Sequence, residues 1–333
     1  MTAMNVKNGF CAAVCFAALS CAACGRSNRA PVACDAARMY RMIEALASDS
    51  LEGRRAASGN DMRAARYLAE ELREAGCEPL WEEMAVPFEM GDAAERNGMR
   101  DILDGEWNDS SCNVVAVIRS GRPDAEKILL GAHYDHMGRF KRDKGAAEAG
   151  VVLYGANDNA SGVAAVVEIA RLLAPYAAEF KRDLIVALFG AEEMGIVGSR
   201  RLERMLRDSS VVVGHMVNLE MLGRMRGDTL VLQGGATCRS DEVAESVPRP
   251  DSLFVHVADE FSAGSDHIAF ARRMIPVSFF VTTDCSTLHR ATDTPESLDM
   301  RGMEKAVNYI AEYLRRLLDA DNLLPWEPKR ELI

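Results

Sequence analysis

Side chains that could ligate a metal ion stand in this sequence at the ends of apolar runs or just before a helical pattern. They are His133, Asp158, Glu193, Glu220 and His289. Imidazole nitrogens and carboxylate oxygens are common ligands of Zn²⁺. In an open α/β sheet, binding sites collect where strands pass into loops at their carboxyl ends. We therefore expect these side chains to meet at one edge of a sheet.

The set has the composition of a two-metal site. Two ions that share a water need a bridging carboxylate, one further carboxylate each and usually one imidazole each. We assign His133 and Glu220 to one ion. Glu193 and His289 are assigned to the other ion, and Asp158 bridges the two. The expected cofactor is two Zn²⁺ per chain, which would lower the pKa of a shared water and polarise a substrate carbonyl.

Three neighbouring side chains have expected supporting roles. Glu192 is the candidate general base, because adjacent residues on an extended segment point in different directions and one can face the water while the other ligates. Asp135 is expected to accept the second ring N–H of His133 and so to fix its tautomer. His136 is an alternative ligand in place of His133.

The elements that must position these residues alternate along the chain. Helical periodicity marks residues 36–46 and 61–75, and a strand pattern marks 78–88. Further short apolar runs predict strands at 113–119, 127–131, 183–190, 211–217, 229–233, 253–257 and 275–281, with helices at 161–173, 198–207, 266–273 and 302–318. Residues 139–150 are expected to form a loop. The fold class is therefore α/β, a mostly parallel mixed sheet between layers of helices.

The first 24 residues have the pattern of an export signal. One charge, Lys7, precedes the apolar run Gly9–Ala23, which is shorter than the roughly 20 residues of a membrane span. Cys24 or Cys21 resembles the lipid-modified cysteine of a bacterial lipoprotein. We expect export to the periplasm, a membrane-anchored lipoprotein or else a secreted protein, with a single domain over 35–320 and a tail over 321–333.

Charge excludes one class of partner. The formal net charge of −11 leaves no basic face to neutralise phosphates, so nucleic-acid binding is not expected. Membrane attachment would rest on the N-terminal lipid alone. We predict peptide substrates and no obligate protein partner.

Six ordered motifs carry a family resemblance. They are GAHYDH, NDNASG, AEEMG, NLEMLG, GSDHIAF and LHRATDT, between Gly131 and Thr294. In this order they resemble the zinc-dependent exopeptidases of metallopeptidase family 28, and the resemblance extends over roughly 35–318. It implies a zinc-exopeptidase fold, a two-zinc site and release of N-terminal residues from peptides, with the roles falling on the residues assigned above.

Two positions depart from that family's pattern. Glu220 stands where well-known members often have Asp, and Leu288 stands where a number of aminopeptidases have a Tyr that helps to stabilise the oxyanion. Glu is a competent zinc ligand, so the assignment of Glu220 is kept. The oxyanion stabiliser is left without a named side chain.

Two other functions compete with a metal-dependent aminopeptidase. A glutaminyl cyclase would use related ligands to cyclise an N-terminal Gln, but the full ligand set for a second ion disfavours it. A catalytically silent binding ectodomain could keep the fold, since fold alone does not establish activity. A decayed site should have lost one of Asp158, Glu192, Glu193 or His289, and all four are present.

Overall fold

One mixed sheet organises the protein. The computed structural model describes residues 33–327, except 123–125, 143–147, 236, 251, 262–263 and the side chain of Ala94. Among these residues nine strands form a single sheet in the order β1-β3-β7-β4-β8-β11-β9-β10, with β2 also paired to β3. The strands are β1 (Glu78–Pro79), β2 (Ala85–Glu89), β3 (Ser110–Ile118), β4 (Lys127–His133), β7 (Leu184–Phe189), β8 (Val213–Glu220), β9 (Thr229–Gln233), β10 (Phe254–Ala258) and β11 (Val277–Thr282).

The centre of the sheet is parallel and its flanks are largely antiparallel. β7, β4, β8 and β11 run parallel to their neighbours in that series. β3 joins β7 antiparallel, and β9 joins β11 antiparallel while pairing in parallel with β10. The carboxyl ends of the four central strands therefore lie at one edge, which is the arrangement that a shared site requires.

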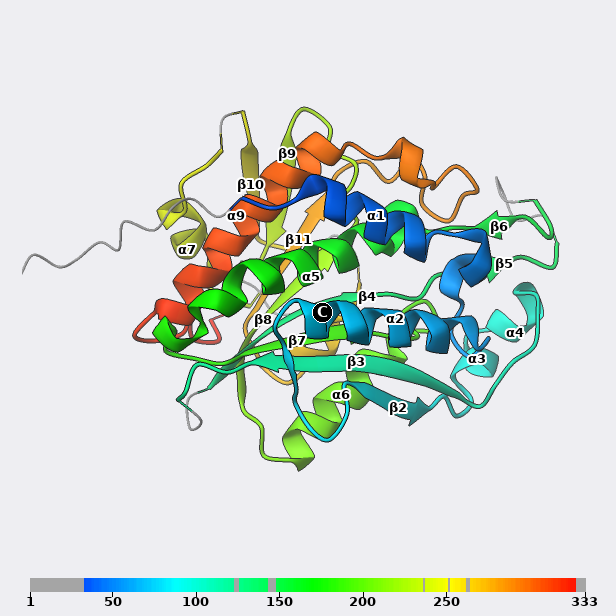
Figure 1. Cartoon of the computed structure of the whole chain (residues 1–333), viewed down its shortest axis with the longest axis horizontal. Coiled ribbons are helices and arrows are strands. Elements are labelled where there is room, and N and C mark those ends of the chain that lie inside the picture. The colour runs from blue at the N-terminus through cyan, green and yellow to red at the C-terminus, as the bar shows by residue number, and fades with distance from the viewer. Residues whose placement is uncertain are drawn as a thin grey trace, which may run out of the picture. The chain divides into compact units, whose positions relative to one another are not determined.

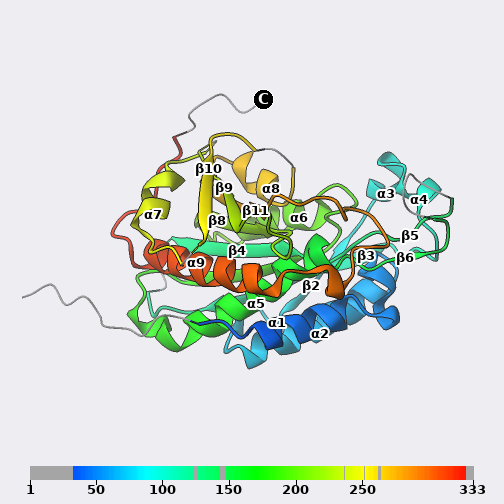
Figure 2. The same ribbon diagram turned by 90° about the horizontal axis from the view of Figure 1, so that it is seen from above.

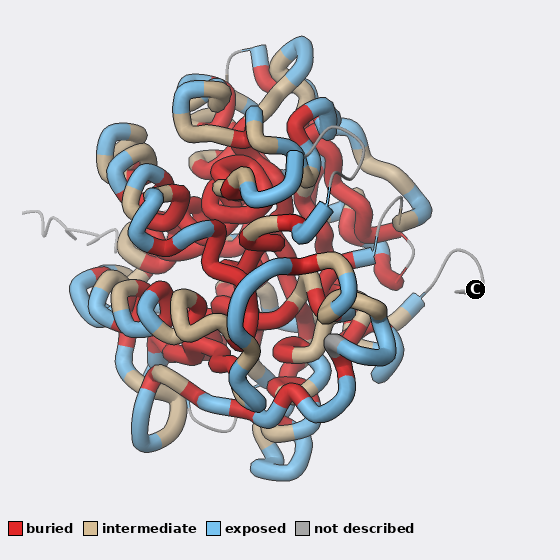
Figure 3. Tube along the Cα trace, turned by 90° about the vertical axis from the view of Figure 1, so that its right-hand side faces the viewer, coloured by how far each residue is buried: buried red, intermediate tan, exposed pale blue. Residues whose placement is uncertain are grey.

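Helices cover both faces of the sheet (Figures 1 and 2). One face carries α1 (Ala36–Leu46), α2 (Asn60–Glu74), α5 (Gly162–Leu173) and α9 (Met300–Asp319), and the other carries α6 (Val197–Asp208) and α8 (His267–Ala271). Alternate residues of β4 serve the two layers: Leu130 packs in the core under the first group of helices, whereas Leu129 packs with the second. Figure 3 shows the buried residues gathered inside, with exposed residues on the peripheral loops. The predicted fold class is confirmed.

α5 is the most deeply enclosed of these helices. The stretch Ala156–Glu179 is long and apolar enough to cross a membrane by length and composition, with a mean hydropathy of 1.3. However, 67% of its most apolar 18 residues are buried within the fold, as expected of a core helix. Its N-terminal end, η2 (Ala156–Ser161), carries one of the predicted ligands.

Most predicted element boundaries hold within a few residues, and two segments differ. The strand expected over 78–88 is divided into β1 and β2, because β1 pairs with residues 116–117 of β3 and β2 with residues 110–114, so the chain between Pro79 and Ala85 leaves the ladder. The loop expected over 139–150 is flanked by a small hairpin of β5 (Gly138–Arg139) and β6 (Val152–Leu153). The remaining described elements are η1 (Asp49–Arg54), α3 (Ala93–Arg96), α4 (Met99–Ile102), η3 (Ala174–Glu179), α7 (Ser240–Ser246) and η4 (Pro295–Ser297). The export signal lies outside the described residues.

Candidate metal centre

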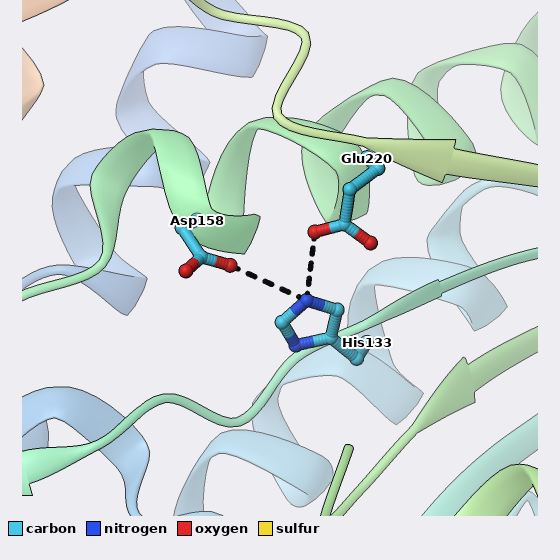
Figure 4. Close-up of side chains that lie close together, drawn as sticks. All are labelled: His133, Asp158 and Glu220. Atoms are coloured by element: carbon cyan, nitrogen blue, oxygen red, sulfur yellow. Dashed lines mark hydrogen bonds and ion pairs between the residues drawn. The ribbon is translucent and has the colours of Figure 1, made fainter. Parts of the chain in front are cut away.

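Strand pairing brings the first two ligands together. His133 is the last residue of β4 and Glu220 is the last residue of β8, and the two strands are parallel neighbours. The imidazole Nε2 of His133 lies 2.9 Å from Oε1 of Glu220 and 3.4 Å from Oδ1 of Asp158 (Figure 4). All three side chains are buried. They form the first ligand cluster.

A second cluster forms on the other side of Asp158. Nε2 of His289 lies 3.4 Å from Oδ2 of Asp158 and 3.3 Å from Oε2 of Glu193. His136, which the sequence offered only as an alternative to His133, lies here as well. Its Nδ1 is 3.0 Å from Oε1 of Glu193 and 3.6 Å from Oδ2 of Asp158. The structure thus brings together the five predicted ligands and places both histidines of the β4 end at the site.

These donor atoms suit a pair of divalent ions. Within each of the groups His133–Asp158–Glu220 and His136–Asp158–Glu193 the donor atoms lie within 4.8 Å of one another. Two donors that each lie about 2.0–2.1 Å from one zinc ion are themselves about 2.9–3.4 Å apart, close to the separations observed here. Asp158 offers one carboxylate oxygen to each cluster, as a bridging ligand must. The donor chemistry and spacing therefore fit zinc.

Histidines set the charge state of the two central carboxylates. Burial raises the pKa of Asp158, but hydrogen bonds from His133 and His289 outweigh it and hold this pKa well below its usual range. For Glu193, burial and the nearby Asp158 act upward, while hydrogen bonds from His136 and His289 bring the pKa down to about 2. Both groups are therefore anionic at neutral pH, the form in which a carboxylate ligates a cation.

The pKa of Glu192 shifts in the opposite direction from the pKa values of Asp158 and Glu193. Burial raises the pKa of Glu192 well above its usual value, and Glu193 adds to the effect while His133 opposes it. Its side chain lines the same cavity as the ligands. A carboxyl group whose pKa is raised by burial holds a proton more tightly than an exposed one, and beside a metal-ligand cluster it suits a general base.

Asp135 supports the site differently from the sequence expectation. Nδ1 of His133 lies 3.1 Å from the backbone oxygen of Asp135, whereas the nearer carboxylate oxygen of that residue is 3.8 Å away. The carboxylate instead accepts the backbone N–H groups of Glu192, at 2.9 Å, and Glu193, at 3.3 Å. Because β4 and β7 are neighbours, Asp135 connects the loops that follow the two strands. It orients the base and a ligand together.

Three further residues hold the ligands, and sequence reasoning assigned them no role. Asp293 accepts the backbone N–H groups of Asn157 at 2.9 Å and Asp158 at 3.0 Å. Ser265 donates its hydroxyl to Oε2 of Glu220 at 2.7 Å. Both lie in motifs that carried the family resemblance, which was the available signal.

The third is Arg54, a fully buried arginine at the end of η1. Its guanidinium donates to the backbone oxygens of Leu46, Tyr134, Tyr154 and Gly155 at 2.6–2.9 Å. Burial lowers its pKa to about 10, and nearby carboxylates, Asp135 and Asp158 among them, act in the opposite direction. Arg54 therefore places a positive charge behind the acidic centre while joining the segments around it.

A cavity of about 620 Å³ opens beside the two clusters. Its lining includes the apolar side chains of Met221, Val231, Phe279, Val281 and Leu288. Among the described residues that line it there is no Lys, Arg or Tyr. Leu288, which stands where a number of aminopeptidases have a tyrosine, is 40% exposed and lines this cavity.

Comparison with known proteins agrees with the site. A model of peptidase family M28 matches residues 113–314, more than half of the chain. A probable zinc metalloprotease of Pyrenophora teres f. teres is 31% identical over 115 residues, 34% of this chain and 23% of the relative. One from Pyrenophora tritici-repentis is 39% identical over 121 residues, 35% of this chain and 23% of the relative. The chain thus matches about a quarter of the length of these fungal relatives.

Solved structures share the fold. The LapA aminopeptidase of Legionella pneumophila superimposes with a TM-score of 0.65 at 20% identity, covering 86% of this chain and 72% of that one. The zinc aminopeptidase BSAP of Bacillus subtilis gives 0.65 at 15% identity, with 87% and 97% covered. A glutaminyl cyclase of Porphyromonas gingivalis gives 0.63 at 17% identity, with 84% and 98% covered. At these identities the likeness concerns the fold.

The fold is shared with a zinc aminopeptidase of known structure, and the ligand clusters suit divalent ions. The chain belongs to peptidase family M28. The resemblance identified from six motifs is thereby confirmed.

Proposed function

We propose that the protein is an aminopeptidase that removes N-terminal residues from peptides at a two-zinc site. The observation that carries the proposal is the position of Glu192, a half-buried acid with a raised pKa in the same cavity as two clusters of ligands that share Asp158. Zinc ions bound there would lower the pKa of a water between them and polarise the scissile carbonyl. Glu192 would accept the proton of the attacking water at its carboxylate and deliver it to the leaving amine.

The charge of the cavity favours the amino end of a peptide. Asp158, Glu192, Glu193 and Glu220 line it, and the described lining residues include no Lys or Arg. Two bound Zn²⁺ ions would offset the charges of the ligands Asp158, Glu193 and Glu220, but the described lining offers no cationic side chain to bind a terminal carboxylate. This electrostatic asymmetry supports an aminopeptidase over a carboxypeptidase.

The test is a panel of peptides, each with a free and an acetylated N-terminus, analysed by mass spectrometry with zinc and after chelation. The proposal expects stepwise release of single residues from the free-amine peptides only, and its loss on chelation. Cleavage of both forms at internal bonds would contradict it.

A glutaminyl cyclase is the second candidate, because a cyclase shares the fold. A peptide with N-terminal Gln distinguishes the two. The aminopeptidase releases free glutamine and a shortened peptide, whereas the cyclase releases ammonia and leaves a pyroglutamyl peptide of unchanged residue count. Dominant formation of pyroglutamate would replace our proposal with the cyclase. If zinc-loaded protein neither releases glutamine nor forms pyroglutamate, the binding ectodomain is favoured.

We also propose that the protein is exported and anchored by a lipid on Cys24 or Cys21. The support is the N-terminal pattern, in which a single Lys7 precedes the apolar run Gly9–Ala23. Metabolic labelling with a fatty acid in a bacterial host would test it, with C24S and C21S compared with the unchanged chain. Absence of label from the unchanged chain, with the protein in the soluble fraction, would contradict the anchor.

A further inference from the structure

We propose that His136 is an additional protein ligand of the centre, so that the second ion is held by two imidazoles and two carboxylates. The inference rests on the two-metal site proposed above and extends it. The first ion would then have three protein ligands, His133, Asp158 and Glu220, and the second would have four: His136, Asp158, Glu193 and His289. The two ions would differ in affinity and coordination.

The distances from His136 and His289 to the same two carboxylates are the first observation in favour of a ligand role. His136 and His289 face the same two carboxylates, and their ring centroids lie 5.7 Å apart. Nδ1 of His136 is 3.0 Å from Glu193 and 3.6 Å from Asp158, while Nε2 of His289 is 3.3 Å and 3.4 Å from the same two residues. Both imidazoles therefore lie within reach of the two carboxylates that would hold the second ion.

The burial of His136 is the second observation in favour of a ligand role. The side chain is fully buried, and its Nε2 has no hydrogen-bond partner among the described residues, so the ring is held at Nδ1 alone. Outside the two ligand clusters, the buried histidines His215 and His267 show no ion pair of this kind among the described residues. His267 is stacked against Phe279, and His215 hydrogen-bonds to the Ser278 hydroxyl. His136 thus has the contacts of a ligand rather than those of a packing residue.

Connectivity explains how one strand end can serve both ions. His133 ends β4, and His136 follows three residues later, after the chain has passed Asp135. The backbone oxygen of Tyr134 accepts from Arg54 at 2.6 Å, and the Asp135 carboxylate is held by Glu192 and Glu193. The short segment between the histidines is therefore fixed on both sides, with one imidazole directed to each cluster.

A competing account makes His136 a protonated partner of Glu193, with no role toward the metal. The two accounts predict opposite effects. A cation beside the site repels a metal ion, so its removal would leave metal affinity unchanged or raise it. A ligand contributes to binding, so its removal would weaken the second ion at least 100-fold, more than the 10- to 100-fold effect typical of residues that only orient ligands.

The first measurement uses the unchanged protein. The metal-free full chain is loaded with one equivalent of Zn²⁺, and zinc K-edge X-ray absorption gives the number of imidazoles per ion. The inference expects two, because the site with more protein ligands fills first. One imidazole per zinc would overturn it.

The second measurement uses H136C loaded with Co²⁺. Nδ1 is the ring nitrogen nearer the backbone and a thiolate binds at a longer distance, about 2.3 Å for zinc, so a cysteine sulfur can reach the same ion. The inference expects a new thiolate-to-cobalt charge-transfer band that is absent from the unchanged protein, which controls for Cys285 in the cavity. In H136A, the second ion should bind at least 100-fold more weakly, with H267A as the matched control. A spectrum without the band, or zinc affinities of H136A within threefold of the unchanged protein, would overturn the inference.

These readouts are independent of peptide hydrolysis. Normal zinc binding with two imidazoles but no hydrolysis would overturn only the proposed aminopeptidase function. Hydrolysis with one imidazole per zinc would overturn only the role of His136.

Discussion

At the scale of single residues, neighbouring acids in this site acquire different chemistry from their contacts. Glu192 and Glu193 are adjacent in sequence, yet burial raises the pKa of Glu192 while hydrogen bonds from His136 and His289 bring that of Glu193 down against the effect of burial. One side chain is therefore suited to carry a proton and the other to bind a cation. Divergent environments of this kind identify acid–base pairs.

The change E192Q separates these roles. An amide keeps the shape of the side chain but cannot accept the proton of the attacking water, so we expect the turnover number to fall by about 10²–10⁴ with zinc content unchanged. Steady-state kinetics and metal analysis of the same preparation measure both quantities. A rate within threefold of the unchanged enzyme would reject Glu192 as the base, and E193Q is the matched control, for which zinc content should fall.

At the scale of elements, we expect two strands to determine which substrates fit. Val231 of β9 and Val281 of β11 are register partners and both line the cavity. With Met221 and Phe279 they form a wall without charge. Apolar side chains at the N-terminus of a peptide would gain free energy by leaving water for such a surface.

The change V281D tests this preference. A carboxylate on the wall would disfavour apolar side chains, and we expect kcat/KM for a leucyl peptide to fall about tenfold or more relative to that for a lysyl peptide. V281T, which has nearly the same shape, is the control and should retain the leucyl preference. Equal kcat/KM ratios for V281D and the unchanged enzyme would place the substrate side chain elsewhere.

The sequence sufficed for the elements whose pattern is local. Most of the alternating strands and helices after residue 127 could be predicted because each apolar run has the length and period of its element, whereas α7 was not predicted. The end of β4 at His133 was recognisable for the same reason, as was Asp158 before α5. Local pattern could not show the break after Pro79, because that depends on which residues of β3 are available for pairing.

The site was harder to predict where its contacts are long-range. His136 could be assigned only as an alternative to His133, since spacing does not reveal that Glu193 lies 3.0 Å from its ring. The carboxylate of Asp135 was expected on His133, whereas it binds backbone N–H groups 57 and 58 residues away. Arg54 has no acidic partner in its own segment, so its place behind the centre follows only from the folded chain.

At the scale of the whole molecule, Arg54 links segments that are distant in sequence. Its four backbone acceptors belong to the end of α1, the turn after β4 and the turn before η2. Buried carbonyls that lose a donor each destabilise the folded state by about 1–3 kcal/mol. The Arg54 side chain therefore fixes the segments that lead into the metal centre, and the folded state depends on it.

We expect R54M to lower the free energy of unfolding by about 3 kcal/mol or more, since several buried oxygens lose their donor together. R54K keeps the charge but reaches fewer oxygens, so its loss should be smaller. Urea unfolding followed by circular dichroism measures both variants. Unfolding midpoints equal to that of the unchanged protein would contradict the role assigned to Arg54.

The most direct test of a two-zinc peptidase is reconstitution of the metal-free chain with increasing zinc while the hydrolysis of a free-amine peptide is followed. The ligand clusters share Asp158, and both ions are required for the proposed chemistry. We predict no hydrolysis without metal and a rate that becomes maximal at two equivalents per chain. An undiminished rate in the metal-free protein, or a maximum already at one equivalent, would contradict the account.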